Sequence, residues 1–139
     1  MKVNFFLITW ITVALGMTGC SGIALIDGRT YADDIAVSMP SLTDLTDGDY
    51  RGSYTMAIPA GSVAMAREFQ VIVRLDSGSG TRRITDIIVE IPVEYPDGAF
   101  IPSMISRVVD AQDLDVDSVS GSTFSSKSFL KAVEHALTP

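Results

Sequence analysis

The chain has 139 residues, of which 47% are hydrophobic and 19% are charged, with 11 Gly, 6 Pro and one Cys. This composition excludes a disordered tail, a collagen-like fibre, a disulfide-stapled miniprotein and a polytopic membrane protein. Lys and Arg number 10 against 17 Asp and Glu, which gives a formal net charge of −7, and the basic residues are scattered. Nucleic acid is therefore not an expected partner, because a phosphate backbone is bound through clustered positive charge. At this length a single domain is expected.

The N-terminal segment has the features of an export signal. Lys2 precedes an apolar stretch, residues 5–17, that is shorter than the roughly 20 residues of a bilayer-spanning helix. The residues that end in Cys20 resemble the lipobox of bacterial lipoproteins, in which the cysteine becomes the lipidated first residue of the mature chain. The sequence therefore predicts a lipoprotein signal peptide at residues 1–19. Acyl chains on Cys20, palmitate among them, would anchor the protein in a membrane of the bacterial cell envelope. An ordinary signal peptide is the alternative.

Residues 20–46 mix glycine, proline and scattered aspartates, and they are predicted to form a tether with one short helix. The folded domain is predicted to occupy residues 47–139. In its first half, apolar side chains fall on alternate positions of three segments, as half-buried strands require: residues 50–58, 69–75 and 83–91. In the third segment this alternation places Thr85 on the same face as Ile87. Short, turn-rich connections predict an antiparallel meander.

The second half of the domain has the spacing of helices. Apolar residues recur at helical intervals from Ile101 to Val109, which predicts a helix over residues 102–112. A second apolar stripe predicts a helix from about Ser125 to Thr138. We therefore predict a small α+β domain, in which about three antiparallel strands are covered on one face by two C-terminal helices.

A hydroxyl-rich loop precedes the last predicted helix, where residues 117–126 read DSVSGSTFSS. The N–H groups at a helix N-terminus favour an anion such as phosphate, through direct hydrogen bonds and through the helix dipole. Gly121 allows a backbone conformation that residues with a Cβ rarely adopt. The alternative for this loop is simple capping of the helix by Ser or Thr.

Residues 117–123, DSVSGST, resemble the flavinylation motif of FMN-binding domains, Dxx(S/T)GA(T/S). Such domains occur in flavin-carrying subunits of the sodium-translocating NADH:quinone reductase and related complexes, and in small exported flavoproteins. The resemblance implies that Thr123 carries FMN through its hydroxyl oxygen, attached by a separate flavin transferase that uses FAD. The matching recognition positions are Asp117, Ser120, Gly121 and Ser122, the last in place of the usual Ala.

The resemblance extends to residues 47–54 (DGDYRGSY), which are similar to the DGxYxG opening strand of the family, and to residues 126–137, which are similar to its closing helix. The glycine-rich loop that longer members place before the first helix has no match in EYPDGAF, residues 94–100. The aromatic candidates for contact with the flavin ring are Tyr95, Phe100 and Phe124, and for each the alternative is an ordinary core or surface position.

The resemblance implies an electron carrier rather than a self-contained enzyme, and the predicted lipoprotein signal adds export and a lipid anchor at Cys20. Its expected partners are the flavin transferase during maturation and, during function, a redox partner protein or a membrane electron-transfer complex. The alternative, from a different class, is a lipid-anchored binding or structural module with the same fold and no flavin.

No metal site is expected. His135 is the only histidine and Cys20 the only cysteine, so a zinc site of the usual composition is excluded. His135 is interpreted as a surface residue of the last helix. A calcium-binding EF-hand loop is also not expected, because the glycine at its sixth position and its final glutamate are missing. The acidic cluster that raises this question consists of Asp110, Asp113, Asp115 and Asp117.

Overall fold

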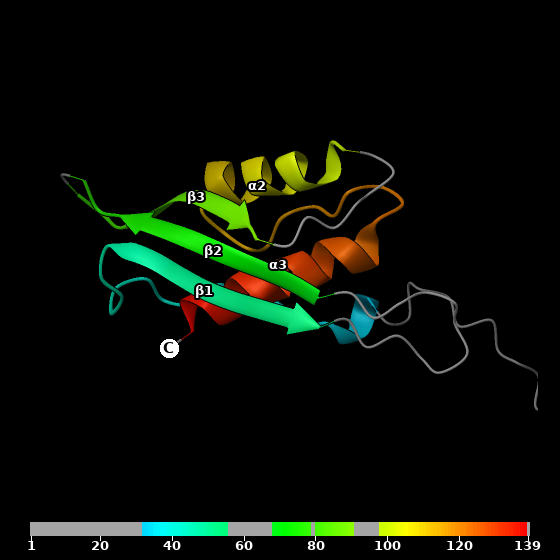
Figure 1. Cartoon of the computed structure of the whole chain (residues 1–139), viewed down its shortest axis with the longest axis horizontal. Helices are drawn as coiled ribbons and strands as arrows, with labels where there is room; N and C mark the ends of the chain where they lie inside the picture. The colour runs from blue at the N-terminus through cyan, green and yellow to red at the C-terminus, as the bar shows by residue number, and fades with distance from the viewer. Residues whose placement is uncertain (1–31, 56–67, 79, 91–97, 139) are drawn as a thin grey trace, which may run out of the picture.

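The computed structural model describes residues 32–55, 68–78, 80–90 and 98–138. Its principal elements are β1 (Gly48–Thr55), β2 (Glu68–Asp76), β3 (Arg83–Val89), α2 (Phe100–Ala111) and α3 (Thr123–Leu137). The strands pair antiparallel in the order β1-β2-β3. In Figure 1, α3 crosses behind β1 and β2, whereas α2 lies along β3. The predicted α+β domain, with three antiparallel strands and two C-terminal helices, is confirmed.

Strand β2 supplies the centre of the core because its alternate side chains face the helices, as the predicted period of two requires. The four side chains on this face are at most 2% exposed: Phe69, Val71, Val73 and Leu75. They form one cluster with buried side chains of both helices, among them Met104, Val108, Phe129 and Val133. Both helices begin two residues earlier than predicted, α2 at Phe100 and α3 at Thr123.

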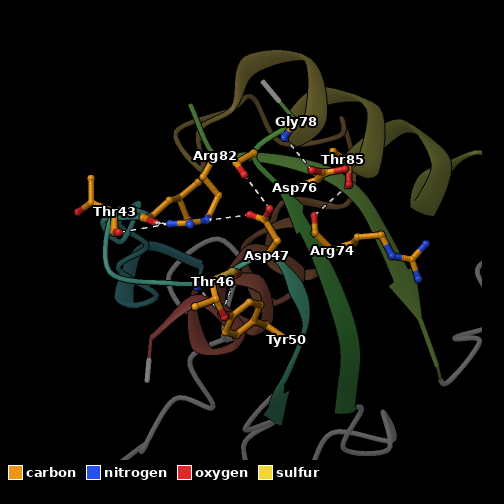
Figure 2. Close-up of polar contacts among 11 residues, drawn as sticks. Thr43, Thr46, Asp47, Tyr50, Arg74, Asp76, Gly78, Arg82 and Thr85 are labelled. Carbon is orange, nitrogen blue, oxygen red and sulfur yellow. Dashed lines mark hydrogen bonds and ion pairs between the residues drawn. The ribbon is translucent and has the colours of Figure 1, made fainter. Parts of the chain in front are cut away.

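Strand β3 departs from the predicted alternation at Thr85. The register between β2 and β3 shifts beside this residue, which has no opposite residue on β2 and forms a β-bulge. Consequently Ile84 and Ile87 both face the core, at 1% and 2% exposure, while Thr85 is exposed. The Thr85 hydroxyl donates to the Arg74 carbonyl oxygen at 3.3 Å (Figure 2). The prediction that Thr85 and Ile87 share a face is therefore wrong.

Gln112 ties the end of α2 to the edge strand β3. It adopts a left-handed conformation, with φ 55°, and its N–H donates to the Val108 carbonyl oxygen at 2.8 Å. Its side-chain amide accepts a hydrogen bond from the Ile84 N–H and donates one to the Ile84 carbonyl oxygen, both at 2.8 Å. The carboxamide thus takes the place of a neighbouring strand's peptide group. This contact fixes the point from which the chain leaves α2 toward α3.

Helix α3 packs on β1 without an intervening side chain at Gly52. A Cβ on Gly52 would lie 2.7 Å from the Ala136 Cα, and closer still to the Ala136 nitrogen and the Ala132 carbonyl oxygen. Both alanines are buried, so a helix face of small residues meets a strand position that has no side chain. The second glycine of the DGDYRGSY segment is therefore required for close backbone approach.

Residues 32–46, which the sequence assigns to the tether, pack against the domain. Leu45 is 7% exposed and belongs to the core, because its apolar side chain gains more from burial than from contact with water. The Ser38 hydroxyl donates to Glu134 Oε1 at 3.1 Å, which joins this segment to α3. The folded part of the chain thus includes residues ahead of the predicted domain boundary. The rest of the predicted tether and the signal peptide lie outside the described residues.

Asp47 and Arg82 connect the segment before β1 to the β2–β3 connection (Figure 2). Arg82 Nε donates to Asp47 Oδ1 at 3.2 Å, and its Nη1 donates to the Leu42 carbonyl oxygen at 2.8 Å. The Ser77 hydroxyl donates to the other carboxylate oxygen of Asp47 at 2.7 Å. The bond from Ser77, followed by that from Arg82, holds the pKa of Asp47 below its ordinary value.

Gly52→Ala should lower the free energy of unfolding by about 3 kcal/mol or more, because strand and helix backbones must separate to admit the methyl group. Gly80→Ala is the control, since nothing lies within 4 Å of a Cβ built there, and it should change stability by about 1 kcal/mol or less. Urea unfolding of the two variants and the wild type measures both effects. Equal losses in the two variants would show that the contact at Gly52 is not a close one.

Asp47→Asn should remove a pH-dependent part of the stability. The folded-state pKa of Asp47 is lowered from its ordinary value of 3.8. The charged carboxylate therefore stabilises the fold at pH values above 3.8. This contribution disappears as the pH falls through the lowered folded-state pKa. Urea unfolding at a series of pH values should show the wild type more stable than the variant at neutral pH, with the difference shrinking in acid. A difference that is constant or grows in acid would be the opposite result.

Candidate functional site

The loop between α2 and α3 ends in a tight turn. The Ser122 N–H donates to the Val119 carbonyl oxygen at 2.9 Å, which closes a turn over Ser120 and Gly121. Gly121 has a φ of 77°, and nothing lies within 4 Å of a Cβ built on it. The left-handed conformation, rather than a lack of space, therefore favours glycine here, and a positive φ at the third turn position is typical of type II turns.

Ser126, which is 0% exposed, forms hydrogen bonds to the turn from its buried side. Its hydroxyl oxygen accepts a hydrogen bond from the Val119 N–H at 3.0 Å and donates one to the Ser122 carbonyl oxygen at 2.9 Å. A single side chain of α3 thus bonds both ends of the turn that precedes the helix.

Helix α3 begins at Thr123 without a side-chain cap. The preceding residue, Ser122, forms no capping hydrogen bond through its side chain, and the first turn contains no acidic residue. The alternative of simple helix capping by Ser122 is therefore not observed. Because the first N–H groups of an α-helix have no acceptor within the helix, this end favours an anion. Thr123 is exposed at this end of α3.

Arg107 of α2 holds the start of the loop motif, since its Nη1 donates to the backbone carbonyl oxygen of Asp117. Asp117 is exposed, and within the described ranges its carboxylate forms no hydrogen bond or ion pair. The Asp117 backbone is thus part of the fold, whereas its carboxylate is accessible to a partner. Lys127 follows Thr123 by four residues on α3, the spacing of side chains on one helix face, and adds a positive charge there.

The structure brings together the loop residues that the sequence singles out. Ser120 and Gly121 form the turn, Ser122 precedes α3, and Thr123 is its first residue. The site therefore combines an exposed hydroxyl, an uncapped helix N-terminus and a glycine turn, and this set of donors fits a phosphate group bonded to the hydroxyl.

The aromatic residues predicted as candidates for contact with the flavin ring differ in burial. Phe100 is 1% exposed and belongs to the core, so the core alternative is confirmed for this residue. Phe124 follows Thr123 and is half-buried, packed against the core. Tyr95 and the predicted lipidation site Cys20 lie outside the described residues.

The roles of Ser126 and Arg107 were not predicted from the sequence. Ser126 follows Ser122 by four residues, the spacing at which a serine hydroxyl in a helix bonds the carbonyl oxygen of the preceding turn, and this signal could have identified it. No comparable signal marks Arg107, because its partner is a backbone atom in a different segment.

His135 lies on α3 away from the loop. It is exposed, its Nδ1 is 2.8 Å from the Ser53 carbonyl oxygen, and its ring packs edge-on to Tyr54 with centroids 5.9 Å apart. Within the part of the chain that the structure describes, no three His, Cys, Asp or Glu side chains gather as ligands for a metal ion. None of the described helices has the length and apolar character needed to cross a membrane.

A family model, the FMN-binding domain, matches residues 64–138. This range spans β2, β3, both helices and the whole loop motif. No curated protein and no solved structure gives a significant match to the chain.

Proposed function

The chain belongs to the FMN-binding domain family and has FMN as its cofactor, and from this premise we propose that it is an exported, lipid-anchored electron carrier with FMN joined covalently to Thr123. The family match, which covers more than half of the chain, favours this function over a binding or structural module without flavin.

The observation that carries the proposal is the position of Thr123. It is an exposed residue, it is the first residue of α3, and it directly follows the turn that contains Gly121. The N–H groups and dipole of a helix N-terminus stabilise the negative charge of a phosphate. Ser122 in place of the family's usual Ala is compatible with this role, because its side chain forms no capping bond that would compete for the N–H groups.

The proposed attachment is a phosphoryl transfer from FAD to the Thr123 hydroxyl, carried out by a separate flavin transferase. The Thr123 oxygen forms a bond to the phosphorus on the FMN side of the FAD pyrophosphate. The bond from that phosphorus to the bridging oxygen breaks, AMP leaves, and the hydroxyl proton passes to a base of the transferase or to water. No electrons are exchanged, and the product is a phosphodiester between Thr123 and riboflavin.

When bound, FMN supplies reversible electron transfer, while the protein supplies attachment and orientation. Covalent attachment suits an exported protein, because a cofactor that dissociated outside the cytoplasm would be lost by diffusion. The proposed electron partner is a redox protein or a membrane electron-transfer complex, reached from a lipid anchor at Cys20. Phe124, beside Thr123 and partly at the surface, is the described aromatic residue proposed to contact the flavin ring.

Thr123→Ala should abolish covalent flavin, because it removes the oxygen that forms the ester, whereas Thr123→Ser keeps the hydroxyl and should retain it. Each chain is produced together with the flavin transferase, unfolded, freed of dissociated flavin and measured by flavin absorbance. Circular dichroism before unfolding should be the same for all three chains, since residue 123 is exposed. Equal amounts of retained flavin on the Ala variant and the wild type would refute attachment at Thr123.

Asp117→Ala should sharply reduce flavin incorporation without unfolding the domain. The substitution removes an exposed carboxylate and keeps the backbone oxygen that Arg107 binds, so stability should change by about 0.5 kcal/mol or less. Asp115→Ala is the matched control, since it makes the same charge change at an exposed residue of the same loop outside the recognition positions. Transfer rates and melting temperatures are measured for both variants. The recognition role fails if the two variants accept flavin at the same rate.

Cys20→Ala should prevent lipidation. The variant should take up no labelled palmitate, and its exported domain should move from the detergent phase to the aqueous phase, because the acyl chains provide the anchor. Its melting temperature should be that of the wild type. Palmitate on the variant would place the lipid elsewhere, and a domain that stays with membranes after a high-salt wash would reveal another membrane contact.

A further inference from the structure

We propose that Ser126 is a positioning residue for flavin attachment, which holds the motif turn in its reactive shape before FMN arrives. The proposal rests on the attachment of FMN to Thr123. Ser126 is not one of the recognition positions that the motif itself supplies, and it acts on Thr123 through the turn.

The contacts of Ser126 form a closed arrangement around the turn. Its hydroxyl accepts from the Val119 N–H at 3.0 Å and donates to the Ser122 carbonyl oxygen at 2.9 Å. The Ser122 N–H in turn donates to the Val119 carbonyl oxygen at 2.9 Å. The backbone N–H and carbonyl groups at both ends of the turn are therefore all bonded, and Thr123 is the next residue along the chain.

Among the described residues, none supports the outer side of the turn in a comparable way. Ser120 and Gly121 are exposed, and no neighbouring atom lies within 4 Å of a Cβ built on Gly121. The hydroxyl of Ser126 is 0% exposed, so water cannot easily replace it as the acceptor for the Val119 N–H. Loss of this hydroxyl should therefore loosen the turn and, with it, the position of the Thr123 oxygen.

Ser128 provides the contrast within the same helix. It is also 0% exposed, and its hydroxyl donates to the Phe124 carbonyl oxygen at 2.9 Å, a contact inside α3. Ser126→Ala and Ser128→Ala thus remove the same buried group from the same helix, but only Ser126→Ala breaks bonds to the turn. The pair separates positioning of the loop from general destabilisation.

The experiment measures FMN transfer from FAD to the full chain by the purified flavin transferase, with intact mass as the readout, at a temperature well below the melting temperature of every variant. Ser126→Ala should lower kcat by about tenfold or more with little change in KM, and Ser128→Ala should stay within about twofold of the wild type, because a small misplacement of a reacting group slows a reaction steeply. A lower kcat with an unchanged KM is expected because Ser126 places the acceptor oxygen and does not bind the transferase.

Hydrogen exchange of the chain without flavin gives a second readout that does not depend on the transferase. The Val119 N–H should exchange faster in Ser126→Ala than in the wild type, and at the wild-type rate in Ser128→Ala. Ser126→Cys keeps the volume of the side chain and a weak donor and acceptor, and it serves if the Ala variant does not fold. Ser126→Cys should accept FMN from the transferase more slowly than the wild type does.

Three results would overturn the proposal. If the folded Ser126 variant accepts FMN as fast as Ser128→Ala, or if its Val119 N–H exchanges at the wild-type rate, Ser126 has no positioning role and attachment at Thr123 still stands. If the wild type itself gains no FMN from an active transferase, the proposed attachment fails, and the role of Ser126 fails with it.

Discussion

Helix α3 packs directly on β1 at Gly52, and this contact positions the helix relative to the sheet. Because no side chain separates this strand from Ala132 and Ala136, the backbones of strand and helix lie directly against each other here. The contact of His135 with β1 supports the same end of the helix. Since a helix is a stiff element, contacts in its second half also determine where its first residue, Thr123, leaves the sheet surface. The opening strand therefore helps to position the first residue of α3.

The loop at the site is supported by side chains that bond to backbone atoms. Gln112 holds the end of α2 on β3, Arg107 holds the carbonyl oxygen of Asp117, and Ser126 bonds both ends of the turn. These contacts leave the side chains of Asp117 and Thr123 exposed. Such a division suits the proposed function, because a loop that another protein must recognise and modify needs a fixed backbone and accessible side chains.

Features set by local pattern were predictable from the sequence. The alternation in β2 predicted its buried face, and the loop motif predicted Gly121 in a turn just before a helix, because a positive φ is a property of that position alone. The bulge at Thr85 was missed because it depends on the register with the neighbouring strand. The burial of Leu45 was missed because Leu42 and Leu45 are the only apolar side chains of residues 41–47, too few to define a periodicity. Arg107 was missed because it bonds to a backbone atom of the following loop, and such a contact depends on no side chain of that loop.

Esterification of FMN to Thr123 can be tested by peptide mass spectrometry of the exported protein, produced together with the flavin transferase. The peptide that contains residue 123 should gain the mass of one FMN less one water. Fragmentation should place this mass on Thr123 rather than on Ser120, Ser122 or Ser125. An unmodified peptide from protein that carries flavin, or FMN on one of those serines, would show that Thr123 is not the attachment site.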